Sequence, residues 1–239
     1  MDKIGPIDYV IIIPLYNDAK ILRNSVDLLL GVFDSWDKKS WRIILADNCS
    51  SDATETIGRE IAQRSNGRIS YFYVPQAGKG NALRETIKKI NSKFYLYVDS
   101  DIPLPPEGII NFFNPLEDGE ADLIVGKRIG GRRPWHRRLL TICLAKILYI
   151  FFGLKVRDAL SGIKAMNKKA SDIMIERCRE NGFFIDGELL TQTKRAGLRI
   201  KEVPMQWIEQ RYNERKSSVK MVSVSVKALW TLMKIFYRD

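Results

Sequence analysis

The feature that most constrains the fold is a series of short apolar runs that alternate with helical patterns. The first run, Ile7 to Ile13, is continuous, rich in β-branched residues and followed by Pro14, which is typical of a strand buried on both faces. Further runs of this kind cover residues 41–46, 69–74, 94–98 and 121–125. Such alternation implies right-handed crossovers between parallel strands. The sequence therefore predicts an α/β fold with a mostly parallel central sheet and helices on both faces.

The pattern loosens in the second half of the chain. We expect strands over residues 162–166 and 200–207 and helices over residues 168–179 and 187–196. The final stretch, residues 219–237, has the spacing of a long amphipathic helix. Its lysines lie seven residues apart and hence on one face, which is either solvated or turned toward a membrane.

Polar residues directly follow three of the first four predicted strands. They occupy residues 14–18, 47–48 and 99–101. In an open parallel sheet, ligands bind outside the carboxyl ends of the strands. We therefore expect these residues to converge on one crevice.

Two of these residues, Asp99 and Asp101, are carboxylates held close together by a proline-rich turn. Like charges at this spacing raise each other's pKa unless a cation lies between them. Mg²⁺ or Mn²⁺ suits such a pair, because these ions are usually bound by one or two carboxylates together with substrate phosphates. Gly78, Lys79 and Gly80, at the start of a predicted helix, offer amides and an ammonium suited to phosphate. The sequence therefore predicts a metal site that a diphosphate substrate completes.

Several functional classes lack their residues in this chain. His136 is the single histidine, and the three cysteines form no C-x-x-C pair, so a usual zinc site cannot be built. The G-x-x-x-x-G-K-[ST] and G-x-G-x-x-G spacings of ATPases and dehydrogenases are absent. An odd set of widely spaced thiols favours a reducing compartment. The first apolar run is also too short for a signal peptide, so we expect a cytoplasmic location.

The positive charge of the chain is concentrated in one segment. The net charge is +11, and nine cations with no Asp or Glu lie between Leu123 and Arg157. Nucleic acid, a membrane and a phosphate-bearing substrate all suit such a segment. The same segment contains the apolar stretch Leu139 to Leu154, which as a helix reaches about 24 Å, less than the ~30 Å hydrocarbon core. We expect it either to lie at a membrane surface or to be a buried core helix, and a nucleic-acid patch ranks below both.

Four short motifs follow one another in a characteristic order in the first hundred residues. They are Ile11–Asn17, Asp47–Thr54, Gly78–Ala82 and Asp99–Asp101. Together they resemble family 2 of the inverting glycosyltransferases, which have the Rossmann-like GT-A fold. The resemblance implies that Pro14, Tyr16, Asp18, Asp47 and Lys79 bind the donor, with Asp99 and Asp101 holding the metal and the diphosphate.

Motifs in the second half of the chain restrict the resemblance to a subgroup of this family. Its motifs are Gly126–Arg128, Gly130–Gly131, Asp158 with Ser161–Gly162, residues 184–190 and 202–204, Arg211, and residues 217–220. This set is similar to dolichyl-phosphate mannosyltransferases and glucosyltransferases. It implies one continuous catalytic domain, in which residues 1–126 bind the nucleotide sugar. Residues 127–239 would bind the acceptor through the basic, apolar segment 132–155 and the C-terminal helix.

The resemblance also implies roles for individual side chains. The expected catalytic residues are Asp101, Arg128, Asp186 and Arg211, and the expected ligands of the acceptor phosphate are Arg128, Arg138 and Lys220. Asp18 stands where the family often has glutamate, and Asn48 where a second aspartate is common. Pro103 occupies a place where mannosyltransferase relatives often have a metal-binding glutamine. Metal coordination is therefore expected to rely more on water.

The implied reaction is inverting transfer of a hexose from GDP-mannose or UDP-glucose to a polyprenyl phosphate. A phosphate monoester has a second pKa of about 6 and is largely ionised at pH 7, so this acceptor needs cations more than a base. We expect the enzyme to act at the cytoplasmic face of an anionic membrane, without a nucleic-acid partner. Two alternatives stay open. One is transfer to a sugar hydroxyl with Asp186 as base, and the other is a non-enzymatic module that binds nucleic acid or an anionic surface.

Overall fold

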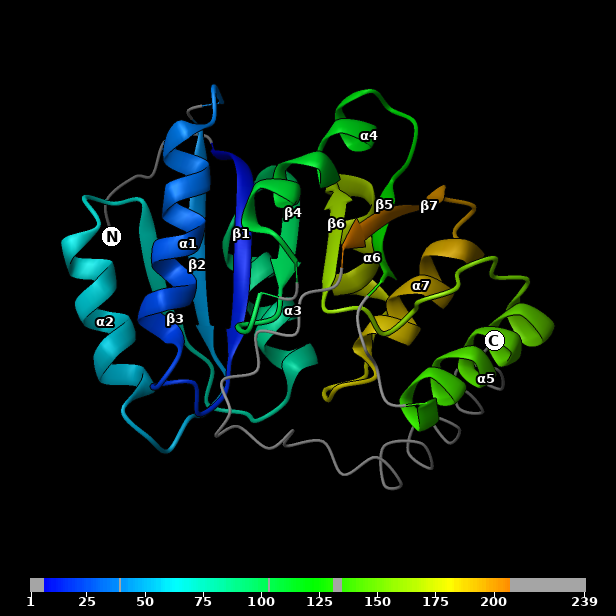
Figure 1. Ribbon diagram of the computed structural model, residues 1–239, viewed down its shortest axis with the longest axis horizontal. Coiled ribbons are helices and arrows are strands. Elements are labelled where there is room, and N and C mark those ends of the chain that lie inside the picture. Colours follow the sequence, from blue (N-terminus) through cyan, green and yellow to red (C-terminus); the bar gives the residue numbers. More distant parts are fainter. Residues whose placement is uncertain (1–6, 39, 103, 131–134, 207–239) are drawn as a thin grey trace.

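A seven-stranded mixed sheet forms the centre of the computed structural model, which describes residues 7–206 except residues 39, 103 and 131–134 (Figure 1). For residues 135–138 and 140 it describes the backbone alone. The strand order is β3-β2-β1-β4-β6-β5-β7. The strands are β1 (Ile7–Leu15), β2 (Trp41–Asp47), β3 (Ile69–Tyr73), β4 (Ser92–Val98), β5 (Leu123–Ile129), β6 (Ile163–Asn167) and β7 (Ile200–Gln206).

The sheet is parallel except at one strand. β1 pairs in parallel with β2 and β4, β2 with β3, and β5 with β7. β6 lies between β4 and β5 and runs antiparallel to both. The expected α/β fold with a mostly parallel sheet is confirmed, and the antiparallel β6 is a feature that the sequence pattern did not predict.

Helices cover both faces of the sheet (Figure 1). They are α1 (Leu22–Ser35), α2 (Thr54–Arg64), α3 (Lys79–Lys89), the 3₁₀ helix η1 (Pro106–Phe112), α4 (Asn114–Glu117), α5 (Trp135–Phe152), α6 (Lys168–Glu176) and α7 (Ile185–Arg195). Alternate residues of each strand point to opposite faces, so β1 contributes Ile11 and Ile13 to one core and Val10 and Ile12 to the other. The first core includes α1, α2, η1 and α4, and the second includes α3, α5, α6 and α7.

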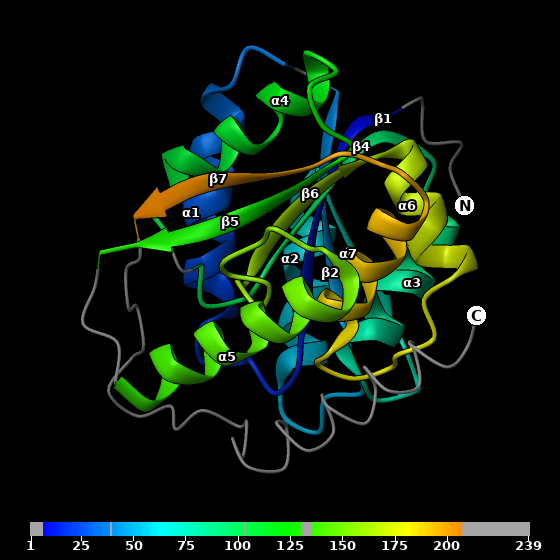
Figure 2. The same ribbon diagram turned by 90° about the vertical axis from the view of Figure 1, so that its right-hand side faces the viewer.

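Helix α5 contains most of the apolar stretch whose position the sequence left open. Its buried side follows a helical spacing through Leu144, Ile147, Leu148 and Phe152, which pack on the second core. Large apolar side chains on its other side are exposed: Leu139, Ile142, Tyr149, Ile150 and Phe151. Figure 2 shows α5 at the periphery, alongside the β5 and β7 edge of the sheet. One side of α5 therefore belongs to the core and the other is exposed, and its location at a membrane surface stays a prediction.

A membrane crossing is not supported by the helices of the described part of the chain. None of them combines the length and apolar character that a crossing requires. The predicted helix over residues 219–237 lies outside the described residues.

The two proposed halves of the chain share one sheet, since β5 begins before residue 126 and pairs with β6. Their division of labour stays a prediction.

Candidate active site

The polar residues that follow the strands lie at one edge of the sheet. The register pairs Leu15 with Asp47 and Ile12 with Tyr97, so the carboxyl ends of β1, β2 and β4 are neighbours. Asp99 begins the turn directly after β4. The predicted convergence of these segments thus follows from parallel pairing of the three strands.

The loop after β1 is organised by side chains that accept hydrogen bonds from its own backbone and the neighbouring loop. Asp18 Oδ2 accepts from the Tyr16 amide at 3.0 Å, and Asn17 Oδ1 accepts from the Ser51 amide at 2.8 Å. Asn17 adopts a φ of 54°, a left-handed conformation that asparagine tolerates better than most residues. Tyr16 is 46% exposed in this loop, so its side chain is accessible to a ligand.

Asp47, an expected donor ligand, is completely buried. Its Oδ1 accepts from the Ser50 amide at 2.9 Å, and its Oδ2 accepts from the Tyr71 hydroxyl at 2.6 Å. Burial and the neighbouring Asp47 carboxylate raise the pKa of Tyr71 far above its ordinary value. Asp47 therefore shapes the loop in this structure, while Pro14 lies beside it at the end of β1, opposite Ala46.

The turn after β4 presents the two predicted metal ligands. The Asp99 side chain is 33% exposed, and its amide donates to the Gly162 carbonyl at 2.8 Å. A Cβ atom on Gly162 would lie 2.4 Å from Asp99 Oδ2, so glycine there makes room for the carboxylate. Asp101 is half-buried two residues further on. The turn therefore places Asp99 and Asp101 just beyond the carboxyl end of β4.

The donor set at this turn suits a hard divalent ion that also binds a substrate. Among the described residues, no group of three or more His, Cys, Asp or Glu side chains is placed to hold a metal. Two carboxylates without a third protein ligand match the usual Mg²⁺ arrangement, in which water and substrate phosphates supply the remaining oxygens. Asp99 and Asp101 thus fit a metal that binds together with a diphosphate.

The start of α3 differs from the expected phosphate cradle. The Gly80 and Asn81 amides donate to the Asn181 carbonyl at 2.9 and 3.3 Å, and the Gly78 amide donates to the Asn48 side chain. A Cβ atom on Gly80 would lie only 2.1 Å from the Glu180 carbonyl oxygen. Asn48 thus engages the Gly78 amide and the segment before α7 engages the Gly80 and Asn81 amides, so these three amides are not open to phosphate in this structure.

The Lys79 side chain joins a buried set of charges beneath the acidic turn. Its Nζ lies 2.9 Å from Asp99 Oδ1 and 3.2 Å from Asp186 Oδ2. Asp186 Oδ1 in turn accepts from Lys164 Nζ at 2.8 Å and from the Tyr97 hydroxyl at 2.6 Å. We call Lys79, Asp99, Lys164 and Asp186 the charge chain, since their charges alternate in sign along it.

The pKa shifts of Lys79, Lys164 and Asp186 depend on burial and on the opposite charges that each group meets. Burial alone would lower the pKa of Lys79, but Asp186 and Asp99 together raise it above its usual value. Among the described residues, Lys164 forms an ion pair with Asp186 alone, and burial lowers the pKa of Lys164. Burial would raise the pKa of Asp186, but the two lysines lower it. The Asp186 carboxylate is therefore ionised and enclosed.

Arg128 lies near the carboxyl end of β5, which is the same sheet edge as the end of β4, since both run antiparallel to β6. Its Nε and one terminal nitrogen each lie 2.5 Å from an Asp158 oxygen. Asp158 is buried, and its amide donates to Glu202 on β7. This two-pronged ion pair fixes the guanidinium at the site.

Several expected site residues cannot be compared with the structure. The Arg138 side chain, Arg211 and Lys220 lie outside the described residues, as does Pro103. Their roles stay predictions.

Lys164 and Tyr97 both contact Asp186 at this site, but the sequence pattern did not predict a role for them. Lys164 is fully buried, and the register places it opposite Tyr97 because β6 is antiparallel to β4. The available signal was a lysine between Ile163 and Ala165 in a predicted strand. A buried lysine needs a carboxylate partner, but the sequence alone does not say which carboxylate supplies it.

This chain is similar to known proteins in sequence and in fold. The model described as Glycosyl transferase family 2 matches residues 10–173. Glycosyltransferase AglD of Haloferax volcanii is 24% identical over 206 residues, covering 84% of this chain and 33% of AglD. The chain thus spans about a third of that relative's length. The UDP-N-acetylglucosamine–dolichyl-phosphate N-acetylglucosaminyltransferase of Methanococcus voltae is 26% identical over 248 residues, covering 95% and 93%.

A solved structure with a similar fold is glucosyl-3-phosphoglycerate synthase from Mycobacterium tuberculosis, in complex with Mn²⁺, UDP and glucosyl-3-phosphoglycerate. The TM-score is 0.72 at 21% sequence identity, and the match covers 97% of this chain and 80% of that one. At this identity the likeness concerns the fold alone. It agrees with the seven-stranded α/β architecture described above.

Proposed function

This chain belongs to glycosyl transferase family 2, and from that premise we propose that it transfers a hexose from a nucleoside diphosphate sugar to a polyprenyl phosphate at a membrane surface. It is a glycosyltransferase with the GT-A fold. One observation carries the proposal for the acceptor: Asp186, the available candidate for a general base, is enclosed between two lysines. The rest of the site supplies cations and an apolar surface.

The enclosed Asp186 separates the two acceptor classes that the sequence left open. A sugar hydroxyl must lose its proton during attack, whereas an ionised phosphate need not. Both Asp186 oxygens already accept hydrogen bonds, the side chain is about 1% exposed, and its pKa is lowered. A carboxylate in this state is a weak and inaccessible base. The geometry thus favours a phosphate acceptor, and the dolichyl phosphate in the name of the Methanococcus voltae relative supports this choice.

The donor side of the proposal rests on the acidic turn. Asp99 and Asp101 would hold Mg²⁺ or Mn²⁺, and a bound ion stabilises the negative charge that develops on the departing diphosphate. The similar mycobacterial structure contains Mn²⁺ and UDP, which supports a divalent ion and a nucleoside diphosphate here. Pro14 and Tyr16 lie at the carboxyl end of β1, the strand that pairs with β4, and would contact the nucleoside. GDP-mannose and UDP-glucose are the donors we propose to test first.

Arg128 would orient the acceptor phosphate. Its guanidinium is held by Asp158 on one side and is 11% exposed, so it is already fixed in direction before a ligand arrives. A planar guanidinium binds phosphate oxygens in pairs and remains charged at all relevant pH values. If the acidic turn holds the donor diphosphate and Arg128 holds the acceptor phosphate, the two reactants are oriented together, which would reduce the entropic cost of the transfer step.

A transfer assay tests the proposed function. The protein is incubated with Mn²⁺, labelled GDP-mannose or UDP-glucose, and vesicles that contain polyprenyl phosphate. We expect label in the lipid phase with polyprenyl phosphate and none with the matching polyprenol, because the alcohol would need a base. Transfer to oligosaccharide hydroxyls but not to the lipid phosphate would support the polysaccharide alternative. Protein that binds DNA yet transfers no sugar from either donor would support the non-enzymatic alternative.

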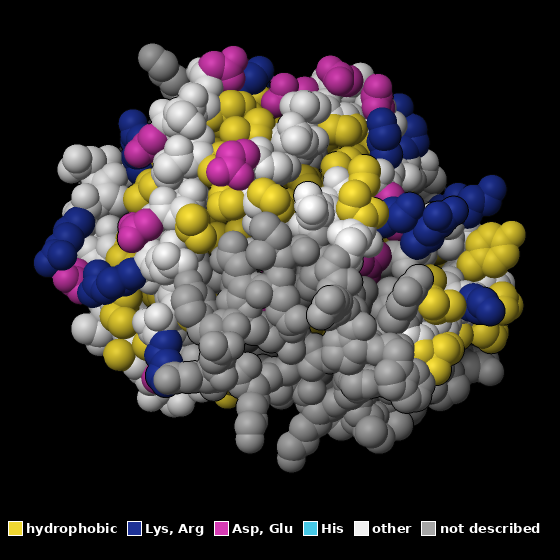
Figure 3. Space-filling view, viewed as in Figure 1, with side chains coloured by type: hydrophobic (Ala, Val, Ile, Leu, Met, Phe, Trp, Pro, Cys, Tyr) yellow, Lys and Arg dark blue, Asp and Glu magenta, His cyan; other side chains and the backbone are white. Residues whose placement is uncertain are grey.

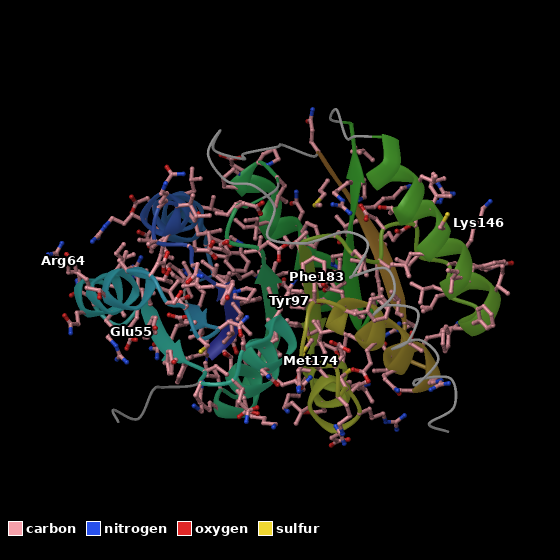
Figure 4. The ribbon with its side chains drawn as sticks, turned by 90° about the horizontal axis from the view of Figure 1, so that it is seen from below. Glu55, Arg64, Tyr97, Lys146, Met174 and Phe183 are labelled. Atoms are coloured by element: carbon pink, nitrogen blue, oxygen red, sulfur yellow. The ribbon has the colours of Figure 1, made fainter. Side chains whose placement is uncertain are left out.

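The exposed side of α5 would bring the enzyme to the membrane. Figure 3 shows apolar and basic side chains close together on the side of the molecule where α5 lies, and Ile150 is 73% exposed. In Figure 4, Lys146 projects from α5 at the end of the molecule opposite Arg64 of α2. Apolar side chains flanked by cations suit the headgroup boundary of an anionic leaflet, where each nearby cation contributes about 1 kcal/mol.

Charge reversal tests this membrane contact. Replacing Arg132, Arg133 and Arg137 by glutamate is expected to release the protein from anionic vesicles in a sedimentation assay, because repulsion replaces attraction. The same charge change at Arg59, Arg64 and Lys88, which are exposed cations on α2 and α3, serves as the control and should have a much smaller effect. Equal sedimentation of both variants with vesicles would contradict a contact through the α5 segment.

A further inference from the structure

The charge chain contains a cation that already lies against a proposed metal ligand. We propose that Lys79 is a positioning residue that holds Asp99 and keeps the affinity of the acidic turn for a divalent ion low until a nucleoside diphosphate is bound. The proposal rests on the proposed function, in which Asp99 and Asp101 bind the metal. It adds an order to that function, because the metal and the nucleotide would enter together.

Lys79 is fixed in place from several directions. Its ammonium bonds Asp99 Oδ1 at 2.9 Å and Asp186 Oδ2 at 3.2 Å, and only 10% of the side chain is exposed. It also lies 5.2 Å from the Tyr97 ring centroid and 5.5 Å from that of Phe183. Figure 4 shows Tyr97 and Phe183 close together near the centre of the molecule. An ammonium in such an aromatic and carboxylate cage has little freedom to leave.

The other side of the chain keeps this arrangement from relaxing. Asp186 is held by Lys164, which is fully buried and also donates to the Ser161 carbonyl at 3.0 Å. Asp186 also accepts from the buried Tyr97 hydroxyl. Asp186 is thus unable to follow Lys79 toward solvent. Asp99, at the more exposed end of the charge chain, is the carboxylate whose orientation Lys79 controls.

This geometry determines what a divalent ion meets at the turn. One oxygen of Asp99 is engaged by a positive charge, and the other, Oδ2, lies so close to Gly162 that a Cβ atom there would be 2.4 Å away. The ammonium offsets part of the negative charge of the two carboxylates and repels an approaching cation. A diphosphate brings further negative charge and oxygen ligands, which restore the attraction. Metal and nucleotide should therefore each increase the affinity of the site for the other by the same factor.

The experiment measures Mn²⁺ binding by the paramagnetic resonance signal of free Mn²⁺, with and without UDP or GDP. For the unmodified protein, we expect at least one nucleotide to tighten Mn²⁺ binding by about tenfold or more. In Lys79→Met without nucleotide, we expect Mn²⁺ to bind roughly tenfold more tightly than in the unmodified protein, and the coupling to nucleotide to shrink accordingly. Lys88→Met removes one exposed charge from the same helix and should change neither quantity.

A second variant separates charge from hydrogen bonding. Lys79→Gln keeps a donor but not the charge, so it should match Lys79→Met in Mn²⁺ affinity and provides the test should the methionine variant not fold. Unchanged or weaker Mn²⁺ binding in the folded variants would overturn the proposal, as would the absence of coupling in the unmodified protein. If Asp99→Asn and Asp101→Asn leave Mn²⁺ binding intact, the metal assignment of the proposed function fails instead.

Discussion

Replacing Asp99 or Asp101 by asparagine is expected to reduce the rate of sugar transfer by roughly 10³-fold. Each change removes one of the two carboxylates that would hold the metal, and the loss of a single preorganised group that stabilises transition-state charge costs 10²- to 10³-fold. Steady-state transfer to polyprenyl phosphate gives the measurement. Asp118→Asn, at an exposed position after α4, should retain activity and serves as the control.

The same variants also separate the enzyme from the binding-module hypothesis. Their sedimentation with anionic vesicles should be unchanged, because the acidic turn and the exposed side of α5 are different surfaces. Asp99→Asn should fold, since Lys79 keeps its contact with Asp186. Transfer that survives both substitutions would show that the metal assignment is wrong, whatever the vesicles show.

Asp186→Ala is expected to lower the free energy of unfolding by about 3–5 kcal/mol, the range for breaking a buried ion pair from one side. The change leaves Lys164 without a carboxylate partner at a fully buried position, and it removes one of the two partners of Lys79. Urea unfolding followed by circular dichroism gives the measurement. Asp172→Ala removes an exposed partner of Lys168 and should cost no more than about 1 kcal/mol.

The pH dependence of stability provides an independent check on Asp186. Burial alone would raise its pKa, but Lys164 and Lys79 lower it below the ordinary value. A carboxyl whose folded pKa is depressed contributes stability above its unfolded pKa of about 4. That contribution is lost as the pH falls through the lower, folded pKa. The acid limb of the stability profile should therefore be shallower in Asp186→Asn, and an unchanged limb would contradict the ion pairing.

The central sheet and the position of the acidic turn could be predicted from the sequence. The β-branched runs at residues 7–13 and 94–98 are local signals of buried strands, and they became β1 and β4. Parallel order then requires the residues that follow these strands to share an edge, so the neighbouring positions of Asp47 and Asp99 could be predicted. The cation-rich, apolar segment could also be recognised from the sequence, because its charge and hydrophobicity depend only on composition.

The roles of the individual charges depended on contacts between distant parts of the chain. Antiparallel insertion of β6 places Lys164 opposite Tyr97, and nothing in a five-residue strand encodes its direction. The segment before α7 covers the start of α3 from about a hundred residues away, which removed the expected phosphate cradle. Asp186 looked like a possible base until the fold enclosed it between two lysines.

Sequence alone thus determined which groups this protein has available for chemistry: paired carboxylates after a buried strand, clustered cations and an apolar helix. The tertiary structure decided which of those groups remain accessible to a substrate. Local patterns specify strands and turns through short-range sterics and apolar burial. The state of a charge depends instead on burial and on partners brought together by the fold, and for Lys79, Lys164 and Asp186 those partners come from three separate elements of the chain.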